Sequence, residues 1–440
     1  MQLSISKQKI VDFLAVPILF LFVYRVFFIP TISTSMIITA FMMPVLLVAF
    51  ANAANKHIIK KWLFTLYVLI IFMIFLSVFY PVFHGTEDFS IAALYIVMLV
   101  ETLVGSLCFY YIFLKNKSLS FLCRCIVIIT VLQSLIILLM FVSPAIRNFI
   151  FQNTISSGEA LFEKYWGVRG FGLASSVVFD LPIILSIGMV LSSYMIFVTR
   201  RTIWFYSFAW IINFVCVMMT GRTGLFGAGL SLLLLLYAFR NKVTLKRTTS
   251  FLFGIFLILL SSFFFLLAVL PENVVELFNT KVIRFAFEMF INVSATGRFG
   301  TSSTDVLFEM YFPISLGTFF LGDGYFMSAN GAYYMGTDGG YMRHVLFYGI
   351  FPSLILYFSY AFGFLAMARK IRYDKLFSVI ILLLGGYFFI AHYKGELFLS
   401  AMLTKIFFIL LIYIFYSKKT NIYTNEYSLL TTIQNNGIKT

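Results

Sequence analysis

Apolar runs of about 20 residues follow one another along most of the chain and are separated by short polar connections. A run of this length crosses the roughly 30 Å hydrocarbon core of a bilayer as an α-helix. The runs lack the polar–apolar alternation of a transmembrane β-barrel. The pattern predicts an all-α polytopic membrane protein with about twelve transmembrane helices. The predicted spans are residues 11–30, 34–54, 62–83, 89–114, 121–143, 171–199, 202–220, 223–239, 250–270, 340–368, 376–394 and 396–416.

Basic residues gather before the first span, after the last span and in alternate connections between them. These groups hold more than half of the 32 Lys and Arg residues: Lys7 and Lys9; Lys56, Lys60 and Lys61; Lys115 and Lys117; Arg200 and Arg201; Arg240, Lys242, Lys246 and Arg247; Arg369, Lys370, Arg372 and Lys375; Lys418 and Lys419. The positive-inside rule places these connections and both termini in the cytoplasm. The net charge of +15 therefore indicates topology and not a nucleic-acid partner.

One long stretch, residues 271–339, is glycine-rich and charged and does not resemble a membrane span. It divides the chain into residues 1–270 with nine spans and an outward loop at 144–170, the large outward loop 271–339, the last spans in 340–418, and a cytoplasmic tail at 419–440. Within the loop, polar residues recur every fourth position over 274–290, which predicts an amphipathic helix in the outer membrane interface. A second helix is predicted to start near Ser302, with Ser302 and Asp305 at capping-box spacing, and to end by Pro313. Both helices are also compatible with simple packing roles.

Composition supports the membrane class, since 61% of the residues are apolar and only 11% are charged. The four cysteines, Cys108, Cys123, Cys125 and Cys216, lie in or at the ends of predicted spans. Their spacing suggests neither a disulfide nor a metal site.

Three outward-facing arginines are flanked by glycines: Arg169, Arg222 and Arg298. Arg169 and Arg222 each come directly before a predicted helix start, where anions bind well. Guanidinium groups bind phosphate oxygens in a bidentate way and stay charged, so several of them would stabilise a departing pyrophosphate without a metal. We expect neither a metal nor a cofactor. The alternative for each arginine is an anchor in the headgroup region.

Further polar residues lie where the large loop re-enters the membrane. Candidates for the general base that activates a sugar hydroxyl are Asp338, His344, Asp305 and Glu309. Asp338 is also a candidate N-cap of the following helix, and His344 a candidate polar contact between helices. Arg343 adds a cation there, and Lys394, in the turn before Glu396, is a candidate phosphate contact or capping residue.

Ionisable residues inside spans normally pair or face a wet cavity. Glu101, near the middle of its span, is compatible with a buried ion pair to Arg25 or with a transporter relay. Asp180 is predicted to line a cavity with Arg169. Lys405 is another intramembrane cation.

Several short motifs together carry a resemblance. They are Gly221-Arg222-Thr223-Gly224-Leu225, the glycine-flanked Arg169 before a span, Thr296-Gly297-Arg298, Phe320-Leu321-Gly322-Asp323-Gly324, Asp338-Gly339-Gly340-Tyr341 and Phe347-Tyr348-Gly349-Ile350. With the predicted topology, this set resembles the Wzy-type O-antigen polymerases of the O-antigen ligase and polymerase superfamily. The matches are scattered over residues 160–400.

The resemblance implies a metal-independent GT-C glycosyltransferase of the bacterial inner membrane, active on the periplasmic side in lipopolysaccharide biosynthesis. Such an enzyme joins undecaprenyl-pyrophosphate-linked repeat units, and a chain-length regulator protein is a candidate partner. It implies that Arg169, Arg222 and Arg298 contact pyrophosphate or substrate. The superfamily's ligases tend to place a histidine beside a polar residue where Asp338-Gly339-Gly340-Tyr341 stands here, which favours polymerase over ligase. A lipid-linked oligosaccharide flippase is the alternative from another class, and it would place its functional charges at the bilayer midplane.

Overall fold

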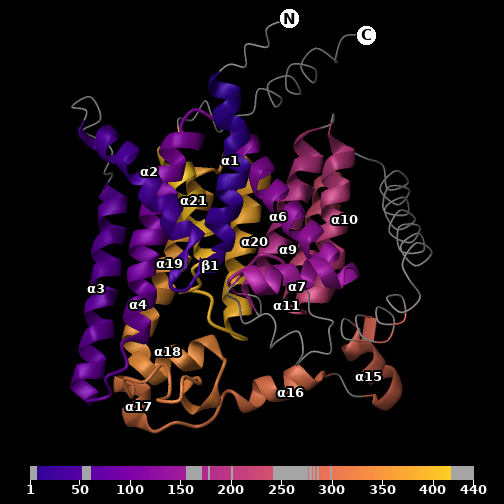
Figure 1. The fold of residues 1–440 in the computed structure, drawn as a ribbon. Helices are drawn as coiled ribbons and strands as arrows, with labels where there is room; N and C mark the ends of the chain where they lie inside the picture. The colour runs from indigo at the N-terminus through magenta and orange to yellow at the C-terminus, as the bar shows by residue number, and fades with distance from the viewer. Residues whose placement is uncertain are drawn as a thin grey trace, which may run out of the picture.

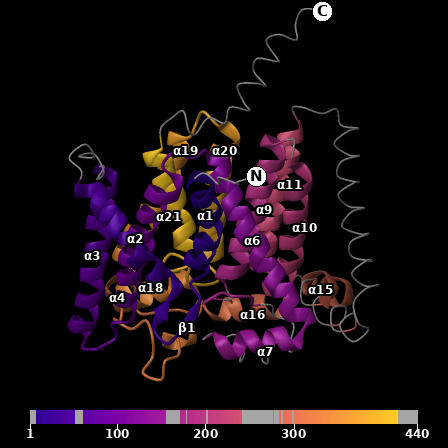
Figure 2. The ribbon, with the colours of Figure 1, turned by 45° about the horizontal axis from the view of Figure 1, so that its top comes forward.

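The computed structural model describes residues 7–51, 61–154, 171–176, 179–199, 202–240, 287–297 and 300–417, together with 276, 280, 283 and 284. Within these residues the fold is nearly all helical and contains one two-stranded hairpin (Figure 1). Long helices stand side by side, and the helices of the large loop lie across one end of them (Figures 1 and 2).

The first half of the chain contains α1 (Lys7–Tyr24), β1 (Phe27–Ile29), β2 (Ile32–Ser33), α2 (Thr34–Ala51), α3 (Lys61–His84), α4 (Ser90–Val97), η2 (Met98–Val104), α5 (Gly105–Phe109), η3 (Tyr110–Leu114), α6 (Leu119–Val142), α7 (Pro144–Asn153), α9 (Asp180–Val198) and α10 (Ile203–Thr220). The second half contains α11 (Thr223–Arg240), α15 (Glu288–Thr296), α16 (Ser302–Glu309), α17 (Leu316–Leu321), η5 (Tyr334–Gly336), α18 (Gly340–Tyr348), α19 (Ile350–Lys370), α20 (Lys375–His392) and α21 (Leu403–Tyr416). The strands β1 and β2 pair antiparallel.

Seven helical segments among the described residues are long and apolar enough to cross a membrane. They are Lys61–His84, Ser90–Leu114, Leu119–Val142, Asp180–Val198, Ile203–Thr220, Ile350–Lys370 and Lys375–His392. Shorter apolar helices cover Thr34–Val48, Thr223–Tyr237 and Leu403–Tyr416. The prediction of an all-α multi-pass membrane protein is therefore confirmed, whereas the count of about twelve spans is not. The predicted span 250–270 lies outside the described residues.

The spans differ in how much of their surface the protein itself covers. In α9, 94% of the most apolar window is buried, because α6, α10, α11 and α20 all pack around it. In α3 only 22% is buried, and large side chains such as Phe75 and Phe83 are exposed. Exposed apolar side chains on a membrane helix face lipid at no cost. We therefore place α9 at the centre of the bundle and α3 at its lipid-facing edge.

Four predicted spans are interrupted or shortened. The span predicted at 11–30 ends at Tyr24, and Arg25 has a φ of 51° before the hairpin begins. The span predicted at 171–199 starts as a helix only at Asp180. The span predicted at 340–368 is two helices, broken at Gly349, and the one predicted at 396–416 begins at Leu403. Hydropathy did not show these breaks, because the non-helical residues are themselves largely apolar.

The large loop is only partly described. The predicted second helix is confirmed as α16, but its N-cap is Thr301, which forms a capping box with Thr304 in place of the predicted Ser302 and Asp305. Most of the amphipathic helix predicted at 274–290 lies outside the described residues. In the 144–170 loop, α7 is described and is capped by Ser143.

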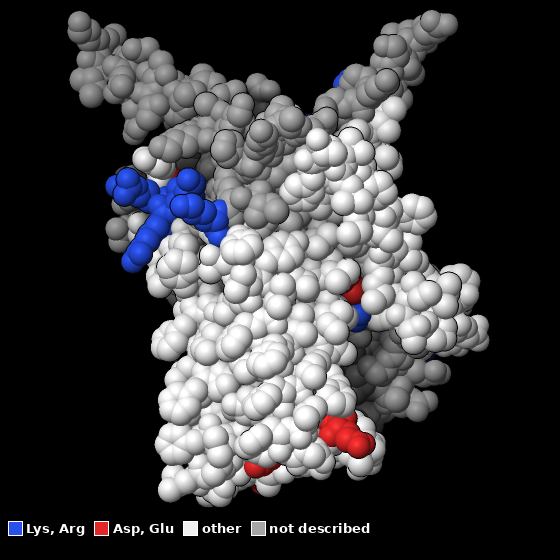
Figure 3. Space-filling model, turned by 90° about the vertical axis from the view of Figure 1, so that its left-hand side faces the viewer, with Lys and Arg blue, Asp and Glu red and all other residues white. Residues whose placement is uncertain are grey.

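On the face shown in Figure 3, basic side chains cluster toward one end, acidic ones lie at the other, and the broad surface between them is almost uncharged. The start of α1 and the end of α21 lie at the same end, because Lys117 binds Asp12 at 2.7 Å and its carbonyl accepts a hydrogen bond from Tyr413 at 2.8 Å. An uncharged belt between charged ends is the surface expected of a membrane-embedded domain.

Two glycines allow α17 to pack on the break between α18 and α19. Gly349 has a φ of 73° and Gly322 a φ of 70°, and a Cβ on either would collide with the backbone of the other segment. The amide of Asp323 also donates to the carbonyl of Leu346 at 2.6 Å. The loop is thereby attached to the helix pair that carries the residues discussed below.

We predict that Gly349→Ala lowers the free energy of unfolding by more than about 1 kcal/mol, because a left-handed backbone strains any side chain with a Cβ. Its Cβ would also collide with the carbonyl of Phe320. Gly386→Ala is the matched control, since a Cβ there meets nothing within 4 Å. Thermal or chemical unfolding in detergent measures both variants. Equal stability of the two would contradict the packing of α17 on this break.

Candidate functional site

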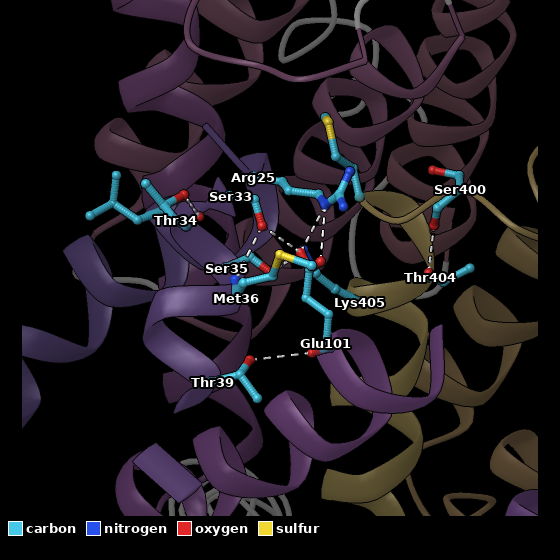
Figure 4. Close-up of polar contacts among 12 residues, drawn as sticks. Arg25, Ser33, Thr34, Ser35, Met36, Thr39, Glu101, Ser400, Thr404 and Lys405 are labelled. Atoms are coloured by element: carbon cyan, nitrogen blue, oxygen red, sulfur yellow. Dashed lines mark hydrogen bonds and ion pairs between the residues drawn. The ribbon is translucent and has the colours of Figure 1, made fainter. Parts of the chain in front are cut away.

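Glu101 is the centre of a buried ion cluster in the middle of the span Ser90–Leu114 (Figure 4). Its Oε1 accepts hydrogen bonds from Arg25 Nε at 2.8 Å and from Lys405 Nζ at 2.9 Å. Ser33 donates to the same oxygen at 3.2 Å, and Ser35 also donates to it. We call Arg25, Glu101 and Lys405 the midspan cluster.

Each member of the midspan cluster lies at an irregularity in the backbone. Arg25 follows the end of α1 with a positive φ, Glu101 is in the π-helical segment η2, and Lys405 is in the first turn of the short helix α21. Positive φ values in residues other than glycine and π-helical turns both occur often at functional sites. The local backbone therefore marks this cluster independently of its charges.

Of the two alternatives that the sequence left open for Glu101, the buried ion pair with Arg25 is present, and Lys405 is a third member that the sequence did not connect to it. Lys405 is 304 residues from Glu101, so no local spacing could reveal the contact. The three charges sum to one excess positive charge if all are ionised. Arg25 uses only its Nε toward Glu101, and its terminal nitrogens point away from the carboxylate (Figure 4).

A second group of polar side chains collects where α18, α19 and α20 meet the segment after α20. His344 Nε2 lies 2.6 Å from Glu396 Oε2, and His344 Nδ1 lies 3.0 Å from the hydroxyl of Tyr357. His392 lies beside His344 with ring centroids 5.2 Å apart and the rings tilted by 43°, and its Nδ1 accepts a hydrogen bond from the amide of Leu397. We call Arg343, His344, His392 and Glu396 the loop-side cluster.

His344, a predicted catalytic residue, is fully buried, and both of its ring nitrogens already have protein neighbours. In this arrangement the imidazole orients Glu396 and is not exposed to a substrate. The alternative that the sequence left open, a polar contact between helices, describes its position well. A direct catalytic role for His344 stays a prediction.

Three donors of the loop-side cluster could hold a metal ion. One ligand atom from each of His344, His392 and Glu396 lies within 4.8 Å of the others; His392 and Glu396 are four residues apart in the chain, and His344 comes from another helix. Zinc would need to sit about 2.0–2.2 Å from each donor, so the direct 2.6 Å contact of His344 with Glu396 would have to open. The neighbouring Arg343 cation also opposes a dication. We treat the group as a polar network.

Arg343 is buried between two aromatic rings. Its guanidinium carbon lies 3.7 Å from the ring centroid of Phe326 and 3.9 Å from that of Tyr333, which are cation–π distances. Burial lowers the pKa of Arg343, and the negative charge of Glu396 opposes that shift. Within the described part of the chain, Arg343 Nε and His392 Nε2 are buried without a hydrogen-bond partner. Buried donors are normally satisfied, so these two mark a place where another molecule can bind.

Asp338 lies beside this cluster at the end of the large loop. It is partly buried and interacts electrostatically with Arg343 and Tyr333. The N-cap of α18 is Gly339, and no side-chain capping hydrogen bond is formed there, so the N-cap role considered for Asp338 is wrong. The structure thus places Asp338 beside Arg343, the neighbour of His344 in α18.

The remaining predicted site residues are more dispersed. Arg222 forms a 2.6 Å ion pair with Glu288, which ties the α10–α11 turn to α15 of the large loop. Lys394 follows Tyr393, whose ring stacks on Tyr311 of the loop with centroids 4.3 Å apart. Arg169 and Arg298 lie outside the described residues.

Asp180 lies between the two clusters. It is buried at the start of α9 and interacts electrostatically with the side chains of Ser176, Ser400 and Glu396. The residues between α20 and α21 therefore connect the two sites, with Glu396 at one end, Ser400 in the middle and Lys405 just beyond. Irregular backbone at membrane depth is tolerated where it is buried in protein or lines a cavity. The cavity that Asp180 is predicted to line with Arg169 involves a residue outside the described ranges.

The geometry defines a polytopic helical membrane protein with two linked polar clusters, one of which lies against the large loop. No protein-family model, curated protein or solved structure matches the chain.

Asp88 holds the segment of the large loop that carries Phe326, whose ring packs on Arg343. Its carboxylate accepts from the amides of Phe326 and Met327 at 2.6 and 2.7 Å. Burial would raise the pKa of Asp88, but these backbone hydrogen bonds and those of Ser90 lower it below its ordinary value. A lowered carboxylate pKa contributes stability above the unfolded pKa of about 3.9, and this stability is lost as the pH falls through the folded pKa.

We predict that at pH 7 Asp88→Asn speeds amide hydrogen exchange at Phe326 and Met327 by at least about tenfold relative to the wild type. The difference should begin to shrink as the pH falls below about 4 and should vanish once the pH is below the lowered pKa of the folded Asp88 carboxylate. Glu87→Gln, at the exposed neighbouring acid, is the control and should change nothing. Hydrogen exchange with mass spectrometry measures both variants, and a difference independent of pH would contradict the charge-based tether.

Proposed function

We propose that the protein is a polysaccharide polymerase of the bacterial inner membrane, a metal-independent GT-C glycosyltransferase that joins undecaprenyl-pyrophosphate-linked repeat units. The observation that supports it best is the loop-side cluster. There, the unpartnered buried donors of Arg343 and His392 lie near the partly buried carboxylate of Asp338. Glycosyl transfer from a pyrophosphate needs such a pair of functions, a cation for the leaving group and a base for the attacking hydroxyl.

In the proposed reaction, a hydroxyl of the acceptor sugar attacks the anomeric carbon of the donor, and Asp338 takes the hydroxyl proton. The bond between the anomeric carbon and the pyrophosphate oxygen breaks, and the pyrophosphate leaves with the electron pair. Arg343 stabilises its negative charge, since guanidinium groups bind phosphate oxygens in a bidentate way.

The other predicted arginines complete the proposal. Arg169 and Arg298 are proposed as further pyrophosphate contacts, and Lys394 as a contact at the outer end of α20. Arg222 is proposed to release Glu288 when an anionic substrate approaches, because the 2.6 Å ion pair is only partly shielded from solvent. The basic end of the molecule would face the cytoplasm with both termini, and the large loop would face the periplasm.

The midspan cluster favours a second candidate, a lipid-linked oligosaccharide flippase. Charges in the middle of a span are what a transporter of anionic lipids would need. We rank it second, because transport does not explain an acid beside Arg343 in a large outward loop. An O-antigen ligase, which transfers polymer to lipid A core, is the nearest enzymatic alternative.

Deletion of the gene separates these functions. We predict surface lipopolysaccharide that carries a single repeat unit, because repeat units would still be made, flipped and ligated but no longer joined. Gel electrophoresis of lipopolysaccharide measures the ladder. Loss of all repeat units from lipid A core would indicate a ligase, and repeat units confined to the cytoplasmic side would indicate a flippase.

Complementation of the deletion strain with variant genes tests whether Asp338 is the general base. Asp338→Asn is expected to leave less than about 1% of the wild-type polymer, since a positioned general base contributes on the order of a hundredfold or more. Glu309→Gln, at an exposed acid of the same loop, should restore the full ladder. A full ladder from Asp338→Asn at equal protein abundance would contradict this assignment.

A further inference from the structure

The midspan cluster has an unbalanced charge. The charged neighbours of Glu101 are Lys405 and Arg25, and those of Lys405 are Glu101 and Arg25. Asp180 has Glu396 as its charged neighbour, so within the described residues it does not neutralise the two cations. An uncompensated charge in a membrane-embedded domain is costly, and such charges normally have a partner.

The cluster also has an unused binding edge. Of the three guanidinium nitrogens of Arg25, only Nε donates to Glu101. Within the described part of the chain the terminal Nη groups form no hydrogen bond or ion pair. The Arg25 side chain is 18% exposed, whereas Lys405 and Glu101 are almost completely buried. The guanidinium is therefore fixed by Glu101 through its Nε, packs on the ring of Phe27 with its carbon 4.9 Å from the ring centroid, and is partly exposed. Such an edge matches two oxygens of a phosphoryl group.

The surrounding backbone adds to the positive potential. α21 begins at Leu403, within one turn of Lys405, and α9 begins at Asp180 near Ser400. The amide of Ser175 donates to the carbonyl of Tyr24, so the end of α1 lies beside the approach to α9. Helix N-termini carry partial positive charge, and interrupted membrane helices use them to bind anionic groups.

We propose that the midspan cluster is a phosphoryl-binding site, in which Arg25 contacts the phosphate oxygens of an anionic lipid and Lys405 supplies the excess charge. Glu101 holds both cations in place. The site is separate from the loop-side cluster and does not depend on the proposed glycosyl transfer. The lipid is either a phospholipid or a prenyl pyrophosphate, and both present the same phosphoryl chemistry.

The test is binding of a ten-carbon prenyl pyrophosphate to the purified full-length protein in detergent, measured by calorimetry. Arg25→Lys keeps the ion pair with Glu101 but removes the guanidinium edge, and we expect its dissociation constant to rise at least tenfold. Arg372→Gln, at an exposed arginine at the basic end, is the control and should bind as the wild type does. Equal affinity of Arg25→Lys and the wild type would overturn the proposal.

Two further arms complete the experiment. Lys405→Met leaves Glu101 paired with Arg25 and removes the excess charge, so its affinity for the prenyl pyrophosphate should fall to a similar degree. This variant replaces Arg25→Lys if Arg25→Lys does not fold. A folded Lys405→Met protein with wild-type affinity would also overturn the proposal. Displacement of the prenyl pyrophosphate by short-chain phosphatidylglycerol would identify a phospholipid site, and retention would identify a pyrophosphate site. Since binding is measured without turnover, the result does not depend on transferase activity.

Discussion

The need to satisfy charges within a membrane-embedded bundle governs this structure. One carboxylate oxygen of Glu101, Oε1, accepts hydrogen bonds from four side chains. These lie after the end of α1, in the hairpin and its adjoining helix α2, and in α21. Removal of one partner of a buried ion pair typically costs about 3–5 kcal/mol, so these segments are firmly tied together. Helix α1 stops, η2 widens and α21 starts late because the charged groups must meet at one depth. The irregular backbone and the polar cluster are therefore two consequences of one constraint.

The same constraint explains the link between the two clusters. The segment after α20 supplies Glu396 to the loop-side cluster and Ser400 to Asp180, and it leads directly to Lys405. A movement of this segment would displace groups in both places. In the proposed polymerase, a lipid phosphoryl group bound at Arg25 and a sugar bound at Asp338 would therefore both affect the position of this one short segment.

Hydropathy was sufficient to predict the class of fold, because long apolar runs have few alternatives to helices in a bilayer. It could not predict the breaks at Arg25, Gly349 and Leu403, since these depend on partners distant in sequence. Among candidate site residues, local motifs brought out Asp338, Arg343 and His344, which do lie together. The contact of His392 with His344 and that of Lys405 with Glu101 carried no local signal, because each joins residues of different helices.

The central claim is that an anionic lipid-linked sugar is bound beneath the large loop, beside Arg343 and Asp338. Electron cryomicroscopy of the protein in lipid nanodiscs with a prenyl-pyrophosphate-linked oligosaccharide tests it directly. The account predicts pyrophosphate density within hydrogen-bonding distance of the Arg343 guanidinium, with sugar density near Asp338. Ligand density confined to the basic end of the molecule, or a loop-side cluster that stays empty at saturating ligand, would contradict it.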